Sequence, residues 1–293
     1  MPTTPHGSYA EAHPRRLIDT RFLRLFRVKK NAATPPYVIL SHIWVQDEEV
    51  SYREFLDGGS NVESKPGYKK IREACSKALE LGFQYLWVDT CCVDQGNHTE
   101  VARNIQSMYF YHRNSEACLV HLFDISGSHK PISRSEWFKR GRSVQELVAS
   151  QAVLFFNRDW DFRGNKLDFK QDIEVETRLP GAVLDGTISV ENVDIWERYE
   201  WFRERITRKP QDLLYFSMGI LGIKLEVRHN EDTVETFHRF WHSFVHFYPN
   251  ARRIFPVEGQ NIFLPFRPPM TIRCYGLPNY LNWPPRQSEF ATH

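Results

Sequence analysis

The sequence has few cysteines, almost no net charge and no long hydrophobic run. Its five cysteines are an odd number in a chain of 293 residues, which argues against a disulfide framework. Lys and Arg exceed Asp and Glu by only two, so no strong positive field points to nucleic acid. No segment approaches the roughly 18 apolar residues of a membrane-spanning helix, and the polar N-terminus is unlike a secretory signal. We therefore expect a cytoplasmic protein that binds neither nucleic acid nor a membrane.

The apolar residues that are present alternate between two periodicities along the chain. Four apolar runs predict buried strands, and three amphipathic segments between them predict helices, in the order 37–43, 66–81, 83–88, 99–112, 117–123, 143–149 and 152–156. Such alternation predicts an α/β fold with a parallel sheet and helices on both of its faces.

The chain divides into four predicted regions. A leader with a short strand or strand pair at 17–28 occupies 1–36, and the α/β core follows at 37–160. A mostly helical extension is predicted over 161–248, with helices at 190–207, 210–221 and 234–247, and a proline-rich tail over 249–293.

Polar residues follow the predicted strands, at the edge where parallel sheets bind ligands. Ser41 and His42 end the first buried strand, and Trp44 follows them. Asp89 ends the second strand, with Cys91 two residues later. We predict that these five residues contact a substrate. Structural roles are the alternatives: His42 can satisfy a loop carbonyl, Trp44 can pack in the core, Asp89 can anchor the following turn, and Cys91 can fill space beside the sheet.

Three segments carry a family resemblance: YVILSHIW at 37–44, LWVDTCCVDQ at 86–95 and WFKRGRSVQELVAS at 137–150. They resemble the signature blocks of the fungal heterokaryon-incompatibility (HET) domain, and RKPQDLLYFSMGILGI at 208–223 resembles a later segment of that family. Two positions depart from the family pattern, which usually has Gly in place of Val45 and Trp in place of Arg142.

The same layout resembles, more distantly, the TIR domains of immune signalling, which have a flavodoxin-like sheet. The segment RSVQEL at 142–147 stands where TIR domains carry a catalytic glutamate that cleaves NAD⁺ between nicotinamide and ribose. Carried over by position, that residue is Glu146. A carboxylate there can stabilise the ribosyl cation as nicotinamide departs. The alternative is a capping box, in which Glu146 bonds back to a helix that begins at Ser143.

Together the resemblances imply a cell-death effector that hydrolyses NAD⁺, with NAD⁺ as its substrate and no cofactor or metal. Adjacent Cys91 and Cys92 lack the spacing of a zinc site. Such an enzyme is expected to act as a homo-oligomer or under an upstream signalling protein. The alternative function is a non-catalytic interaction module for incompatibility signalling, which the departures at Val45 and Arg142 favour.

Overall fold

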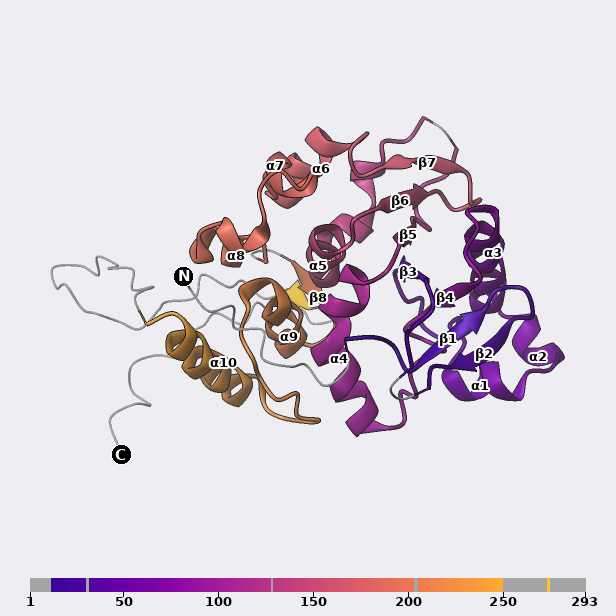
Figure 1. The fold of residues 1–293 in the computed structure, drawn as a ribbon, viewed down its shortest axis with the longest axis horizontal. Helices are drawn as coiled ribbons and strands as arrows, with labels where there is room; N and C mark the ends of the chain where they lie inside the picture. Colours follow the sequence, from indigo (N-terminus) through magenta and orange to yellow (C-terminus); the bar gives the residue numbers. More distant parts are fainter. Residues whose placement is uncertain (1–11, 30–31, 128, 203–204, 250–272, 275–293) are drawn as a thin grey trace, which may run out of the picture.

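A mixed sheet lies at the centre of the computed structural model, which describes residues 12–29, 32–127, 129–202, 205–249 and 273–274 (Figure 1). Within these residues the sheet has seven strands in the order β2-β1-β4-β3-β5-β6-β7. Their bounds are β1 Arg16–Asp19, β2 Arg24–Arg27, β3 Val38–His42, β4 Tyr85–Trp87, β5 Ala117–His121, β6 Val153–Phe156 and β7 Phe162–Asn165. The predicted α/β class is confirmed.

The four central strands run parallel, in the order β4-β3-β5-β6. Counted along the chain, this is the order 2-1-3-4 found in flavodoxin-like sheets. Every residue of β3 and of β5 is buried, as expected for strands covered on both faces. The chain reverses its direction of winding between β3 and β5. In sheets of this kind the crevice at that reversal is the usual ligand site.

Both edges of the sheet are antiparallel, and they flank the four strands that were predicted to be parallel. The pair β1 and β2 forms the hairpin expected within 17–28, and β1 pairs antiparallel with β4. Strand β7, which the sequence pattern did not predict, pairs antiparallel with β6. Only five residues separate β6 from β7, whereas a parallel crossover needs a dozen or more. The short connection therefore dictates the antiparallel edge.

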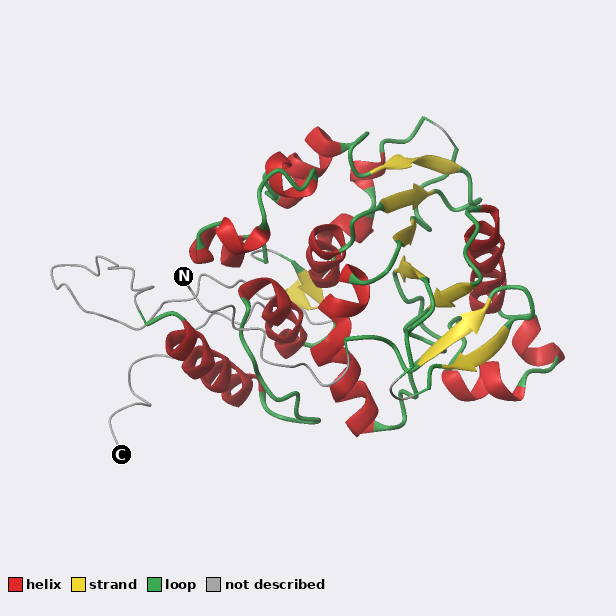
Figure 2. Ribbon diagram, in the orientation of Figure 1, coloured by secondary structure: helices red, strands yellow, loops and turns green. Residues whose placement is uncertain are grey.

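Helices cover both faces of the sheet (Figures 1 and 2). Helix α3 (Pro66–Glu80) lies on one face, with α1 (Tyr52–Asp57) and α2 (Ser60–Glu63) near the hairpin edge. Helices α4 (His98–Arg113) and α5 (Gly141–Ala149) lie on the other face. Helix α3 ends as its sequence predicts: Gly82 has φ +86°, and the amides of Gly82 and Phe83 bond to the last carbonyls of the helix.

The helices of the extension pack on α4 and α5 (Figure 1), whereas its first segment, strand β7, belongs to the sheet. Its helices are α6 Lys170–Thr177, α7 Gly181–Leu184, α8 Ile195–Glu200, α9 Pro210–Leu221 and α10 Thr233–Phe247. Helix α9 contacts α4, α5 and α10. It approaches α4 closely at Gly219, which has no Cβ. A Cβ at this position would lie only 2.4 Å from Cβ of Tyr109.

The helix predicted over 190–207 is mostly wrong. The segment holds a short 3₁₀ turn at Val190–Asn192 and helix α8, and then strand β8 (Ile206–Thr207) pairs with β9 (Arg273–Cys274). Buried Arg205 donates hydrogen bonds to carbonyls of Phe138, Thr177 and Trp201, which fix the chain against the core just before β8. Most of the predicted tail over 249–293 lies outside the described residues.

Candidate functional site

A buried hydrogen-bond cluster joins the carboxyl end of β3 to helix α5. Ser41 Oγ donates to a carboxylate oxygen of Glu146, and Trp137 Nε1 donates to Ser41 Oγ at 2.7 Å. Arg140 Nη1 lies 3.8 Å from the other carboxylate oxygen. Ser41 is on the strand beside the winding reversal, where ligands bind in such sheets. The structure thus brings together Ser41 and Glu146, two of the predicted site residues.

Helix α5 begins three residues earlier than the capping-box alternative requires, since that alternative needs Ser143 as the N-cap. Its N-cap is Arg140 and its first helical residue is Gly141. Ser143 is therefore inside the helix, and its hydroxyl donates to the backbone carbonyl of Trp137. Glu146 faces β3 instead of the helix start. The capping-box alternative is wrong, because the helix turns this carboxylate inward.

His42 is buried beside two carboxylates. Its Nε2 lies 3.5 Å from Glu49 Oε2 and 4.0 Å from Asp89 Oδ1. Burial lowers the pKa of His42, because desolvation disfavours the charged imidazolium. Burial alone would raise the pKa of Glu49, but His42 and Lys70, whose Nζ is 2.6 Å away, lower it to about 2. The predicted contact of His42 with substrate stays a prediction, since His42 is not among the residues that line the cavity described below.

Asp89 ties the loop after β3 to the start of α5. Trp44 Nε1 donates to the two Asp89 carboxylate oxygens at 3.0 and 3.1 Å, and Arg142 Nη1 donates to Asp89 Oδ2 at 2.7 Å. The Arg142 guanidinium also lies 4.6 Å from the centre of the Phe216 ring, a favourable cation–π contact. Asp89 therefore orients two cavity-lining side chains, rather than anchoring the turn that follows it.

Cys91 is fully buried in the hydrophobic core. Burial raises the pKa of its thiol, and the neighbouring Cys92 raises it further. A buried, protonated thiol is a poor nucleophile and a poor ligand. Cys91 is not among the residues that line the cavity, so the structure does not bring it together with the other predicted site residues.

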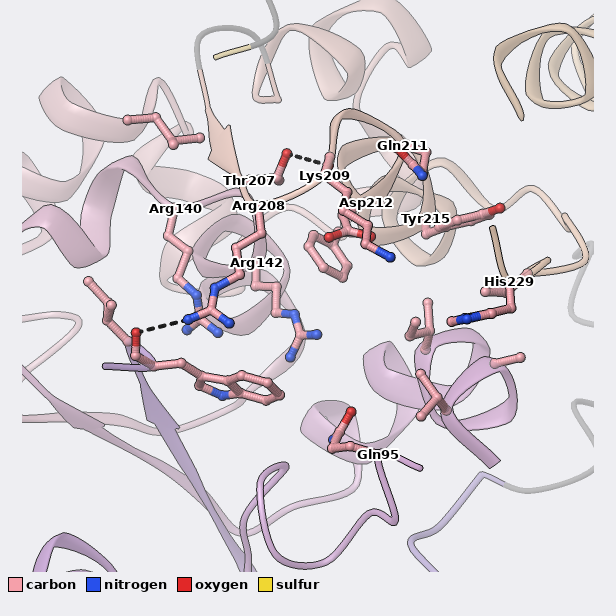
Figure 3. Close-up of a pocket in the computed structure, with 18 of the residues that line it drawn as sticks. Gln95, Arg140, Arg142, Thr207, Arg208, Lys209, Gln211, Asp212, Tyr215 and His229 are labelled. Atoms are coloured by element: carbon pink, nitrogen blue, oxygen red, sulfur yellow. Dashed lines mark hydrogen bonds between the residues drawn. The ribbon is translucent and has the colours of Figure 1, made fainter. Parts of the chain in front are cut away.

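A cavity of about 820 Å³ opens between the loop after β3 and helices α4, α5 and α9 (Figure 3). This volume falls in the range of small-molecule sites. Of the five predicted substrate-contact residues, Trp44 lines the cavity. Glu146 does not: it is 4% exposed, and its carboxylate lies 3.8 Å from Nη1 of Arg140, which does line the cavity.

Positive charge dominates the cavity lining. Its five cations are Arg140, Arg142, Arg208, Lys209 and Arg228, and its two acids are Glu136 and Asp212. Figure 3 shows the guanidinium groups of Arg140, Arg142 and Arg208 gathered at one end. Burial raises the pKa of Asp212, although nearby Arg142 opposes the rise. With two acids against five cations, the lining keeps an excess of positive charge.

Arg208 and Lys209 differ from the other cations in their partners. Arg208 Nη2 donates to the Trp44 carbonyl at 3.3 Å, and its guanidinium carbon lies 5.5 Å from the centre of the Trp44 ring. Within the described parts of the chain, neither Arg208 nor Lys209 forms an ion pair with a carboxylate. By contrast, Arg142 is paired with Asp89 and Arg228 with Glu226.

The sequence prediction considered residues that follow the strands and therefore missed four cavity-lining residues. Arg140 precedes α5, and Arg208, Lys209 and Asp212 belong to the extension. One signal could have found three of them, because Arg208, Lys209 and Asp212 begin the later segment that resembles the family. Among the described residues, no three His, Cys, Asp or Glu side chains are placed to hold a metal. No helix in the described ranges has the length and apolar character to cross a membrane.

Two comparisons match the chain to known proteins. A family model described as Heterokaryon incompatibility protein (HET) matches residues 37–151. Vegetative incompatibility protein HET-E-1 of Podospora anserina is 34% identical over 216 residues, which are 70% of this chain and 16% of that protein. The chain belongs to the heterokaryon-incompatibility family. It therefore spans about a sixth of the length of this relative. No solved structure matches it, so the likeness to TIR domains stays a prediction.

The HET domain supplies only part of the cavity wall. Trp44, Arg140 and Arg142 lie within the residues that the family model matches, whereas Arg208 and Lys209 lie beyond them. The segment at 206–216 closes the cavity from the side of the extension. A HET domain cut at residue 151 would consequently lack the two cations that have no carboxylate partner in the described structure.

Proposed function

We propose that the chain acts in vegetative incompatibility as an enzyme that hydrolyses NAD⁺. The relative's name supports the first part of this proposal, and the placement of Glu146 supports the second. In the reaction, the bond between nicotinamide N1 and ribose C1′ breaks, and its electron pair leaves with nicotinamide. Water oxygen forms the new bond to C1′ and releases one proton. The products are nicotinamide and ADP-ribose.

The observation that carries the catalytic proposal is the Glu146 carboxylate at the carboxyl end of β3. Ser41 holds one of its oxygens, and Arg140 lies beside the other. A fixed negative charge at this place would stabilise the positive charge that develops on ribose C1′. Nicotinamide leaves as a neutral molecule, so the mechanism needs no separate acid.

Access to Glu146 requires a rearrangement. The carboxylate is 4% exposed and does not line the cavity, whereas Arg140, whose Nη1 lies 3.8 Å from it, does. We propose that assembly with further copies, or binding of an upstream protein, moves Arg140 and opens this wall. Such gating fits an activity that kills the cell by depleting NAD⁺, because the enzyme must stay inactive until it is triggered.

The test measures nicotinamide release from NAD⁺ by chromatography, at low and high protein concentration. Glu146→Gln keeps the size and most hydrogen bonds of the side chain but removes its charge, so turnover should fall about 100-fold or more. Glu136→Gln is the matched control, since it removes the same charge from a glutamate of the cavity lining and should leave turnover near that of the wild type. Equal turnover of the Glu146→Gln and wild-type proteins would contradict the proposal.

A non-catalytic interaction module is the second candidate function. The burial of Glu146 favours it, since Ser41 and Arg140 already occupy the carboxylate in a closed cluster. The replacement of the usual Trp by Arg142 also favours it. In that case the folded wild-type protein releases no nicotinamide at any concentration, and Glu146 contributes to stability alone.

A further inference from the structure

The cavity holds more positive charge than its own carboxylates can balance. Asp89 pairs with Arg142, and Glu146 lies beside Arg140. Arg208 and Lys209 form no ion pair with a carboxylate within the described residues. Gathering guanidinium groups at one end of a cavity is unfavourable unless an anion joins them, because like charges repel.

We propose that Arg208 and Lys209, together with Arg142, bind the phosphate groups of a nucleotide in this cavity. Arginine forms paired hydrogen bonds to phosphate oxygens, and lysine adds a mobile point charge. Asp89 and Phe216 already hold the Arg142 side chain in place, so little freedom is lost when a phosphate binds. Arg208 is exposed even though its guanidinium lies 5.5 Å from the centre of the Trp44 ring, so an incoming anion can reach it.

The rest of the lining suits the uncharged part of a nucleotide. Trp44, Phe123, Tyr215 and Phe216 give the cavity aromatic walls, on which bases stack favourably. A volume of about 820 Å³ admits a molecule of this size. A long nucleic acid is disfavoured, because the chain as a whole carries a formal net charge of only +2.

The site is independent of hydrolysis at Glu146, since it forms at the junction of the HET domain and the extension. Its probe is ADP-ribose, which contains the two phosphates and has no nicotinamide–ribose bond to cleave. Binding to the 293-residue chain is measured by calorimetry, with adenosine and inorganic pyrophosphate as further probes. We expect ADP-ribose to bind, pyrophosphate to compete with it, adenosine to bind at least about 100-fold more weakly, and the affinity to fall as salt rises.

Arg208→Gln and Lys209→Gln should each weaken ADP-ribose binding about tenfold. Both residues are exposed, so circular dichroism should show an unchanged fold. The matched controls are Arg27→Gln and Lys69→Gln, which are exposed on β2 and α3 and should bind like the wild type. Wild-type affinity in the Arg208→Gln and Lys209→Gln proteins would overturn the proposal. So would equal binding of adenosine, or no binding of ADP-ribose at millimolar concentration.

The same titration on the Glu146→Gln protein separates this site from the proposed function. If Glu146→Gln and wild type bind ADP-ribose alike and the wild type releases no nicotinamide, the phosphate-site proposal is supported and the proposal of NAD⁺ hydrolysis is contradicted. If the wild type releases nicotinamide and Arg208→Gln binds ADP-ribose with wild-type affinity, the proposal of NAD⁺ hydrolysis is supported and the phosphate-site proposal is contradicted.

Discussion

Two polar clusters lie near the carboxyl end of β3, and they differ in what balances their charge. In the sealed cluster, Ser41, Trp137 and Glu146 are buried and bonded to one another. In the open cluster, Arg208 and Lys209 are exposed and line the cavity without a carboxylate partner in the described residues. The difference separates two uses of polar groups. The sealed cluster holds elements of the fold together, and the open cluster has charge left over for a ligand.

The largest expected effect comes from replacing Trp137 of the sealed cluster, compared with Trp44, which contacts Arg208 of the open cluster. Trp137 is fully buried against Phe138 and Phe155, so Trp137→Ala should lower the free energy of unfolding by about 3–5 kcal/mol. Trp44 is half-buried in the cavity wall, and Trp44→Ala should cost about 1 kcal/mol. Urea denaturation of the two variants and the wild type measures both losses of unfolding free energy. Equal losses of stability would abolish the distinction between sealed and open clusters.

An intermediate effect is expected from acid, through two buried histidines, His112 and His121. Burial lowers the pKa of His112 and of His121 to about 4, against about 6.5 in the unfolded chain. The unfolded state therefore binds more protons between these values, and stability falls as pH drops below 6.5. By pH 5 the loss should be about 2 kcal/mol for each histidine.

Denaturation midpoints at pH 7.5, 6 and 5 measure this loss above the range where most carboxylates titrate. His112→Gln should flatten the pH dependence, because it removes one of the two buried imidazoles. A wild-type midpoint that stays constant from pH 7.5 to pH 5 would show that the buried histidines do not control acid stability.

The smallest expected effect comes from removing one negative charge near the open cluster. Asp212 is an acid among the cavity cations, and burial raises its pKa. Asp212→Asn should strengthen ADP-ribose binding severalfold, on the order of 1 kcal/mol, because it removes negative charge near the proposed phosphate site. Asp57→Asn, at an exposed acid at the end of α1 and outside the cavity lining, is the control. Weaker binding by Asp212→Asn would mean that this acid helps to orient the ligand.

Elements with a local signal were predictable from the sequence. The apolar spacing of Ile71, Cys75 and Ala78 and the glycine at 82 define α3 and its end without reference to the rest of the chain. Strand β7 was missed because FRGN has little apolar alternation, and its pairing depends on the short connection from β6. The antiparallel edges likewise follow from chain geometry rather than from residue type.

The site was predictable only in part, because its contacts join distant segments. Ser41 and Glu146 were both predicted, yet their hydrogen bond links residues 105 positions apart. The inward turn of Glu146 depends on where α5 begins, and Ser143 gave a misleading helix start. Arg208 and Trp44 are 164 positions apart, and no periodic pattern in either segment indicates that they meet.

The close approach at Gly219 has a consequence for any ligand of the cavity. Helix α4 begins at His98 and α9 follows Lys209, and residues of each helix line the cavity. Where they cross, Gly219 meets Tyr109 with no room for a methyl group. The spacing between opposite walls is thus set by the smallest side chain that a protein has.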